Sequence, residues 1–368
     1  MTIGTAPSRS ECVVIGSPGD ERIERFQSAV QRRGWPQPTV VSYRELSEHG
    51  PGALAAHVRS GTLVRIESPG SSFESFAALV RAGGGTHDEP LAFERGRLRH
   101  VRAWYLGLCR VLQDIAPLLP AGRTMGHPSD IACMFDKRHC HRHLMSHAVP
   151  VPPAFPAPDT FEALLVRMRE QGMPRVFVKL AHGSSASGVV ALHADARGVH
   201  ALTTVERSGS KLYNSKRLLF YRDVRALAAI YETLACEGLH IEAWLPKIGL
   251  DNRPVDLRIL VIAGRARHVV ARAGHGPITN LHIGARRADP ERLRAKIGDS
   301  AWARAVATAE KASKTFPNSL AVGVDLLVEP DPRRIAVLEM NAFGDLLRGA
   351  LHDGEDPYEA QLTEMAPC

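Results

Sequence analysis

The sequence predicts an α/β and α+β protein, in which a small parallel α/β domain over residues 1–124 precedes a larger region over residues 125–368. Short apolar runs alternate with helical segments in the first part, as they do in parallel sheets. Apolar runs also recur through the last third of the chain, where they predict further strands. The chain has 368 residues and 44% apolar content, which is enough for two or three domains.

The first domain is expected to contain three short strands, at residues 12–16, 40–41 and 63–66. A capped helix is predicted from Glu21 to Arg33, and a long helix from about Arg97 to Leu118 closes the domain. Ser68 follows the third strand. Because open α/β sheets bind ligands at the carboxyl ends of their strands, Ser68 is a candidate substrate contact.

The second part begins with a capped helix that is predicted to run from Ser129 to about His147. Five prolines between residues 150 and 158 then predict an extended linker, since proline and the residue before it disfavour helix. The strands expected after it are 176–180, 257–262, 268–272, 322–327 and 335–339.

The charge and cysteine content are ordinary for a globular protein of a reducing compartment. The net charge is +7, but the arginines are spread along the chain without a basic tail, so a phosphate site explains the excess better than a nucleic-acid partner does. Six scattered cysteines predict a reducing compartment. No secretory signal or membrane span is apparent, so we expect a soluble, cytoplasmic protein.

A lysine at the end of a strand precedes a loop of small residues. Lys179 supplies a point charge, and glycine and serine backbone can bring N–H groups close to phosphate oxygens. The loop candidates are Gly183, Ser184, Ser185, Ser187 and Gly188. The alternative is an ordinary hairpin turn beside an exposed lysine, because the loop has neither Walker A nor dinucleotide-binding spacing.

Three oxygen-bearing side chains suit a magnesium site. Glu339 and Asn341 are two residues apart on a predicted strand, so both point to one face, and Asp325 lies on another strand. Carboxylate and amide oxygens are the hard ligands that Mg²⁺ prefers. A strand with an exposed polar face is the alternative.

A third group could hold a polyphosphate or an acyl-phosphate. Asp256 and Arg258 share one strand face, Arg272 ends the next strand, and Asn280 follows in the sequence Thr-Asn-Leu-His-Ile-Gly. Arginines on strands are often merely solvated, so this group is ambiguous by itself.

The order of these residues, from Lys137 to Glu339-x-Asn341, resembles the ATP-grasp superfamily and, within it, the RimK-like carboxylate–amine ligases. The resemblance covers about residues 125–350. It rests on Asp136-Lys137 opening a helix, on Asn280-Leu281-His282-x-Gly284, and on Leu338-Glu339-x-Asn341.

The resemblance implies an ATP-grasp fold in which two subdomains grip ATP. The central lid subdomain would cover about 155–245 and the metal-binding subdomain about 246–350, with residues 1–124 as a pre-ATP-grasp domain. The implied reaction activates a carboxylate with Mg-ATP as an acyl-phosphate, which an amine attacks, releasing ADP and phosphate. The implied substrates are small molecules, amino acids or peptides, and a homodimer is possible.

The resemblance also implies roles for single residues. Lys137 and Lys179 would contact the ATP phosphates under the loop, and Asp256 would hold the ribose. The linker that reads the adenine is implied for Glu242, Ala243, Trp244 and Leu245. The implied catalytic residues are Arg258, Arg272 and Asn280, and Asp325, Glu339 and Asn341 would hold two Mg²⁺ ions, for which Mn²⁺ could substitute. Many relatives have an acidic residue immediately before the linker aromatic, where this chain has Ala243, so the role of Glu242 stays open.

Several alternatives remain at this point. An ATP-grasp phosphotransferase would lack the amine-capturing step, and a regulatory protein would bind nucleotide without turnover. Arg348 could hold a substrate carboxylate or lie on a surface helix. His139, His143 and His147 line one face of a helix and could either contribute to a zinc site or simply contact another domain.

Overall fold

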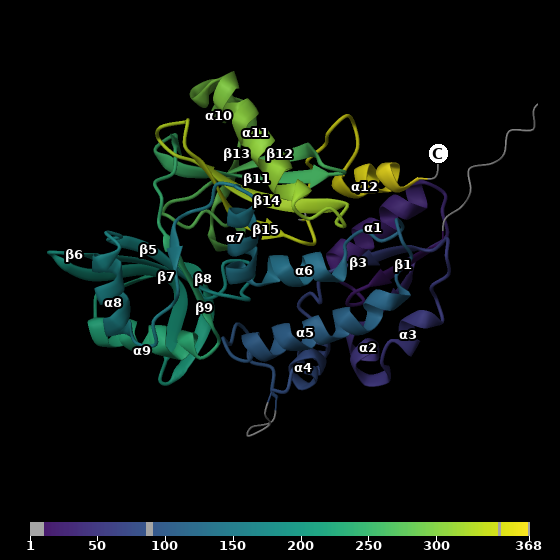
Figure 1. Ribbon diagram of the computed structural model, residues 1–368, viewed down its shortest axis with the longest axis horizontal. Coiled ribbons are helices and arrows are strands. Elements are labelled where there is room, and N and C mark those ends of the chain that lie inside the picture. The colour runs from purple at the N-terminus through teal and green to yellow at the C-terminus, as the bar shows by residue number, and fades with distance from the viewer. Residues whose placement is uncertain (1–10, 86–90, 345–346, 367–368) are drawn as a thin grey trace, which may run out of the picture.

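This computed structural model describes residues 11–85, 91–344 and 347–366. Figure 1 shows three sheets, each with helices packed on it, gathered around the segment that carries α6 and α7. The α/β and α+β fold class predicted from the sequence is confirmed. Within the described ranges, no helix has both the length and the apolar content needed to cross a membrane.

The first domain is built on a parallel sheet in the order β2-β1-β3. Its strands are β1 (Cys12–Ile15), β2 (Thr39–Val41) and β3 (Leu63–Ile66). Its helices are α1 (Glu21–Arg32), α2 (Tyr43–His49), α3 (Gly52–Ala55), α4 (Phe73–Ala82), α5 (Val101–Ile115) and the 3₁₀ turn η1 (Ala116–Leu118). Because all three strands run the same way, the loops that follow β1 and β3 meet at one edge of the sheet.

The single helix predicted from Ser129 to about His147 is wrong, because two helices occupy this segment. They are α6 (Pro128–Phe135) and α7 (Lys137–Ser146). Asp136 between them has an extended backbone, and its side chain accepts hydrogen bonds from the N–H groups of Arg138 and His139. An aspartate that caps a new helix in this way ends the preceding one.

The central sheet is antiparallel, in the order β4-β9-β5-β6-β7-β8, and the helices α8 (Phe161–Glu170) and α9 (Val224–Ala235) pack on it. The strands are β4 (Ala154–Phe155), β5 (Arg175–Leu180), β6 (Val190–Asp195), β7 (Gly198–Ser208), β8 (Lys211–Tyr221) and β9 (Leu239–Ala243). The loop between β5 and β6 carries the small residues noted in the sequence.

The C-terminal sheet is also antiparallel, in the order β13-β12-β11-β14-β15, and β10 pairs with β11. Its strands are β10 (Gly249–Leu250), β11 (Arg253–Ile262), β12 (Arg265–Ala273), β13 (Arg286–Ala288), β14 (Ala321–Val328) and β15 (Ile335–Asn341). The 3₁₀ turn η2 (Leu281–Ile283) and the helices α10 (Pro290–Ile297) and α11 (Asp299–Lys314) complete this part. Every residue of β14 is buried, so a charged residue in that strand requires a partner.

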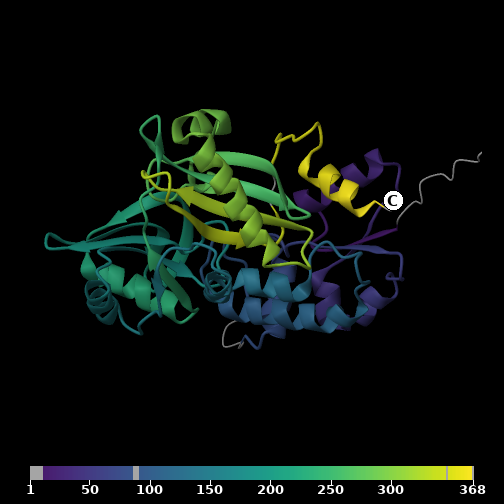
Figure 2. The same cartoon turned by 45° about the horizontal axis from the view of Figure 1, so that its top comes forward.

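The last helix, α12 (Pro357–Met365), lies beside α1 of the first domain, as Figure 2 shows. The rings of Phe26 and Tyr358 pack edge to face with centroids 6.5 Å apart. Arg32 forms ion pairs with Asp356 and Glu359. These contacts pack α12 against the first domain, which no sequence motif indicated.

Candidate active site

The register of the C-terminal sheet aligns the predicted metal ligands. Asp325 on β14 lies opposite Glu339 on β15 and opposite Arg258 on β11, and Asn341 lies opposite Gly323. The ladder is irregular directly after Asp325, where Leu326 pairs with Val337. All three predicted metal ligands therefore lie on one face of two adjacent strands.

Asp325 is buried between two arginines. Arg258 contacts both of its carboxylate oxygens, and Arg272 contributes a contact of 3.0 Å from its Nη2 to Oδ1 of Asp325. Burial alone would raise the pKa of Asp325, but the two guanidinium charges outweigh it and hold this pKa below its usual range. The carboxylate is therefore ionised at neutral pH, as a metal ligand must be. Its metal-binding role stays a prediction, since the arginines occupy both of its oxygens here.

Asp256 is the centre of a second buried cluster. Its Oδ1 accepts a 2.8 Å bond from Arg272, and its Oδ2 accepts one of 2.8 Å from Lys247 and another from Thr279. Burial lowers the pKa of Lys247, and the charge of Asp256 only partly offsets this effect. The ribose-binding role of Asp256 stays a prediction, since protein donors occupy both of its oxygens here.

The two predicted phosphate-binding lysines each contact a carboxylate. The Nζ of Lys137 lies 2.8 Å from Oε1 of Glu339, and the Nζ of Lys179 donates to Glu242. Glu242 also contacts Nε2 of His240 at 3.0 Å. Burial alone would raise the pKa of Glu242, but Lys179 and His240 lower it to about 2. Glu242 therefore holds Lys179 at the end of β5 as an ammonium ion.

The loop after β5 has the conformation expected of an anion-binding turn. Ser185 and Ala186 have φ angles of 52° and 58°, a left-handed conformation that non-glycine residues rarely adopt. The N–H groups of Ser184, Ser185 and Ala186 donate to no acceptor within the described part of the chain. Successive unoccupied donors of this kind form a cradle for phosphate oxygens.

Two adjoining cavities bring most of the predicted residues together. A small cavity of about 90 Å³ lies between the central and C-terminal sheets. A wide cleft of about 730 Å³ continues from it to the first domain. Both cavities are lined by Lys137, Gly183, Arg272, Asn280, Asp325 and Glu339. These six residues therefore mark the junction between the two spaces.

Most of the remaining predicted residues line one of the two cavities, and four line neither. Those that line the small cavity alone are Lys179, Ser187, Glu242 and Asp256, and those that line the wide cleft alone are Ser68, Ser184, Ser185, Arg258, Asn341 and Arg348. Gly188, Ala243, Trp244 and Leu245 line neither. The N–H groups of Ala243 and Trp244 donate to the backbone oxygens of Pro153 and Arg175, so their adenine-reading role stays a prediction.

Solved structures of similar fold identify the architecture of this chain. No protein-family model matches the sequence, and no curated protein matches it either. The ATP-grasp ligase PsnB, complexed with minimal precursor, Mg and ADP, matches with a TM-score of 0.53 at 15% identity, over 98% of this chain and 97% of that one. D-cycloserine synthetase DcsG matches with a TM-score of 0.56 at 15% identity, over 97% and 100%.

A third similar structure is D-alanine–D-alanine ligase from Bacillus anthracis complexed with ATP. Its TM-score is 0.54 at 10% identity, over 98% of this chain and 96% of that one. This chain has the ATP-grasp fold. The resemblance stated from the motifs is therefore confirmed at the level of the fold, and the finer RimK-like grouping stays a prediction.

The oxygen atoms of the predicted metal ligands on β14 and β15 suit Mg²⁺. Mg²⁺ is usually bound by one or two carboxylates together with waters and substrate phosphates, and Asp325, Glu339 and Asn341 supply two carboxylates and an amide. Within the described ranges, no three His, Cys, Asp or Glu side chains gather as they would around a protein-only metal site. The predicted set is consistent with this, since it depends on phosphate to complete the coordination.

Of the three histidines on this face of α7, His143 packs against another part of the chain. The Nε2 of His143 lies 2.9 Å from the backbone oxygen of Thr315, and its ring lies 4.7 Å from that of Phe316. His147 bonds back to the carbonyl of His143 at 2.8 Å, and His139 is exposed. The domain-contact alternative for these histidines fits this arrangement.

Sequence reasoning missed three cationic residues at these cavities. Lys247 reaches Asp256 from three positions beyond the linker aromatic, and only that proximity in sequence could have indicated it. Arg22 and Arg287 line the wide cleft from α1 and β13. Neither lies in a motif, because each reaches the cleft through tertiary packing alone.

Proposed function

We propose that this chain is an ATP-dependent, ADP-forming ligase that joins a carboxylate to an amine through an acyl-phosphate. The observation that carries the proposal is the junction between the two cavities, where Asp325 and Glu339 lie beside Lys137 and Arg272. The small cavity, at about 90 Å³, is below the usual size of a ligand pocket, so ATP would have to displace the loop after β5 to present its terminal phosphate at this junction. An acid substrate in the wide cleft would meet that phosphate from the opposite side.

The residues at the junction supply what phosphoryl transfer requires. This reaction depends on positioning and on neutralising the charge of the transferred group, with little covalent chemistry from the protein. Lys137, Lys179 and the N–H groups of the loop after β5 would bind the phosphates. Arg272 and Asn280 would face the group in transfer, with Arg258 keeping Asp325 in place.

Asp325, Glu339 and Asn341 would hold one or two Mg²⁺ ions, which supply charge neutralisation at the phosphates. Binding requires an exchange of partners, because Glu339 is paired with Lys137 here. That exchange would free Lys137 for a phosphate as the carboxylate turns to the metal. Lys137 and Glu339 would thus each take a new partner, and neither charge would be left uncompensated.

The similar structures support a ligase over a kinase. PsnB and D-alanine–D-alanine ligase are named as ligases and DcsG as a synthetase, and PsnB was solved with a precursor. We infer for this chain an amino acid or a peptide as one substrate, in keeping with the RimK-like motif. The wide cleft is within the range of about 300–1,000 Å³ that ligand pockets usually have.

The test is to trap the activated acid. The protein is incubated with Mg-ATP, hydroxylamine and a panel of carboxylic acids, and both ADP and acyl-hydroxamate are measured. Hydroxamate formed in proportion to ADP is the expected result. A stable phosphorylated product would favour the phosphotransferase alternative, and failure of Mg-ATP to raise the melting temperature would reject the nucleotide site altogether.

A further inference from the structure

The wide cleft carries an excess of positive charge. Its lining includes six cationic side chains, from Arg22, Lys137, Arg258, Arg272, Arg287 and Arg348. It includes only three carboxylates, from Asp20, Asp325 and Glu339. A cleft with this balance attracts anions, and the distribution of its charges indicates where they bind.

The charges at the junction compensate one another. Lys137 pairs with Glu339, and Arg258 and Arg272 pair with Asp325. Three cations thus face two carboxylates at the junction, and the rest of the excess comes from Arg22, Arg287 and Arg348 against the single carboxylate of Asp20. We call the end of the cleft that is lined by Asp20, Arg22, Ser68, Gly70 and Ser71 the N-terminal wall. Arg287 and Arg348 reach the same cleft from the C-terminal part.

The single carboxylate of the N-terminal wall is already in use. Asp20 is the N-cap of α1, and its Oδ1 accepts a 2.9 Å bond from the N–H of Arg22. The Nη1 of Arg22 is 3.6 Å from the same oxygen, which is beyond hydrogen-bond length. Asp20 therefore neutralises the end of a helix and leaves the guanidinium of Arg22 only loosely compensated.

A buried glutamate lies near Arg22 without bonding to it. Glu67 is fully buried, and its Oε1 lies 3.9 Å from the Nε of Arg22. The other oxygen of Glu67 accepts two bonds from Arg65, at 3.0 and 2.7 Å. The Nε of Arg22 is itself buried and has no hydrogen-bond partner within the described residues. Buried polar atoms are normally bonded, so the protein alone does not satisfy the guanidinium of Arg22, whose side chain is 27% exposed.

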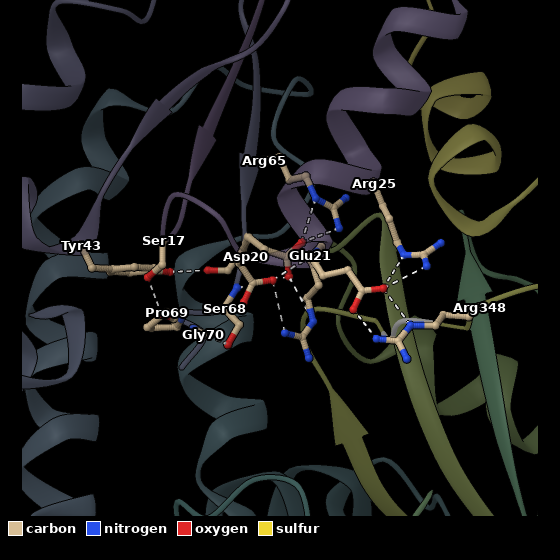
Figure 3. A network of polar contacts seen from close by, with 12 residues as sticks. Ser17, Asp20, Glu21, Arg25, Tyr43, Arg65, Ser68, Pro69, Gly70 and Arg348 are labelled. Atoms are coloured by element: carbon tan, nitrogen blue, oxygen red, sulfur yellow. Dashed lines mark hydrogen bonds and ion pairs between the residues drawn. The ribbon is translucent and has the colours of Figure 1, made fainter. Parts of the chain in front are cut away.

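The loops that carry the N-terminal wall are fixed, as Figure 3 shows. Ser17 after β1 donates to the backbone oxygen of Pro69 after β3, and Tyr43 donates to the backbone oxygen of Glu67 at 2.6 Å. Arg348 is held opposite by Glu21. A wall preorganised in this way loses little entropy when it binds a ligand.

We propose that Arg22 binds a second carboxylate of the acid substrate, so that this ligase acts on compounds carrying two carboxylates. This inference rests on the proposed function, since the first carboxylate is the one activated at the junction. A guanidinium suits the task, because its planar donors match the two oxygens of a carboxylate. Arg22 is then the residue that determines specificity at the N-terminal wall.

The experiment compares acids that differ only in the second carboxylate. Dissociation constants are measured by thermal shift in the presence of Mg-ADP. The pairs compared are L-glutamate and L-glutamine, succinate and succinamate, and acetyl-Glu-Ala-Glu-amide and the same peptide with one glutamate replaced by glutamine. At least one diacid is expected to bind at least about tenfold more tightly than its half-amide, as a hydrogen bond to a charged group gives. The first two pairs represent free diacids and the third represents a peptide.

Arg22→Gln is expected to remove this preference, and Arg22→Lys to retain part of it. Arg25→Gln is the matched control, because Arg25 lies on the same helix, pairs with Glu21 and does not line the cleft. The proposal is overturned if wild type shows no preference in any pair, or if Arg22→Gln keeps it. If Mg-ATP raises the melting temperature while the preference is absent, the proposed function survives and only this inference fails.

Discussion

The two ends of the wide cleft handle their charges differently. At the junction, the carboxylates of Asp325 and Glu339 lie within 3.0 Å of cationic nitrogens. At the N-terminal wall, the guanidinium of Arg22 lies 3.6 and 3.9 Å from its nearest carboxylates. The charged groups at the junction therefore have to exchange partners when a ligand binds. At the N-terminal wall, the guanidinium of Arg22 is available to donate to a ligand without such an exchange.

This difference has an energetic consequence. Removing one member of a buried ion pair leaves an uncompensated charge, which costs about 3–5 kcal/mol of stability. Changes at the junction should thus affect folding and ligand binding together. Changes at the N-terminal wall should mainly affect ligand binding, because its ion pairs are longer or more exposed.

The largest effect is expected for Glu339→Gln. This change keeps the shape of the side chain but removes a metal-binding charge and the partner of Lys137. A bound metal stabilises the transition state by several kcal/mol, so we expect ADP release to fall by about 10³-fold or more. The stabilisation by Mg-ATP should shrink in the same variant, as a thermal shift can measure.

The control for this prediction is Glu329→Gln. Glu329 follows β14 at the turn between the two strands, and it lines neither cavity. This variant should keep both turnover and the Mg-ATP shift. Normal turnover in Glu339→Gln would contradict the metal assignment.

Lys179→Met should affect both stability and nucleotide affinity. It leaves Glu242, which is 3% exposed, with His240 as its remaining partner. We expect the unfolding free energy to fall by about 3–5 kcal/mol. Adding Glu242→Gln should recover most of this loss without restoring ATP binding, and urea unfolding with and without Mg-ATP separates the two effects.

If the double variant stays as unstable as Lys179→Met, the Lys179–Glu242 pair is not the source of the loss. If it binds ATP normally, Lys179 is not a phosphate ligand. Either result would weaken the expectation that the buried ion pairs beside the junction affect folding and ligand binding together.

The sequence predicted the junction better than the N-terminal wall for a physical reason. Asp325, Glu339 and Asn341 lie on strands whose two-residue period fixes the face each side chain takes, so their convergence follows from local pattern. Arg22 reaches the cleft because α1, β3 and α12 pack together, and no local period encodes that. The periodic pattern missed the break at Asp136, although the resemblance had Asp136-Lys137 opening a helix, because capping competes with helix periodicity within one residue.

The pH dependence of stability should also report on the small cavity beside the junction, which Glu242 lines. The folded-state pKa of Glu242 is about 2, below its ordinary value of 4.5. A lowered carboxyl pKa contributes stability that is complete above pH 4.5 and is lost as the pH falls toward 2. Urea midpoints between pH 6 and 3.5 should therefore decline more steeply below pH 4.5 in wild type than in Glu242→Gln. If the two variants give parallel plots of urea midpoint against pH, the ionised form of Glu242 does not stabilise the folded state as predicted.

The smallest effect is expected for Glu21→Gln, beside the N-terminal wall. Glu21 pairs with Arg348, and the two side chains are 37% and 60% exposed. Exposed pairs contribute little and are screened by salt, so we expect the melting temperature to change by less than about 3 °C, and less still at 0.5 M NaCl. The same variant releases Arg348 from its tether to α1. A large, salt-resistant loss of stability would mean that this wall is held by ion pairs as tightly as the junction is, which would end the distinction between the two.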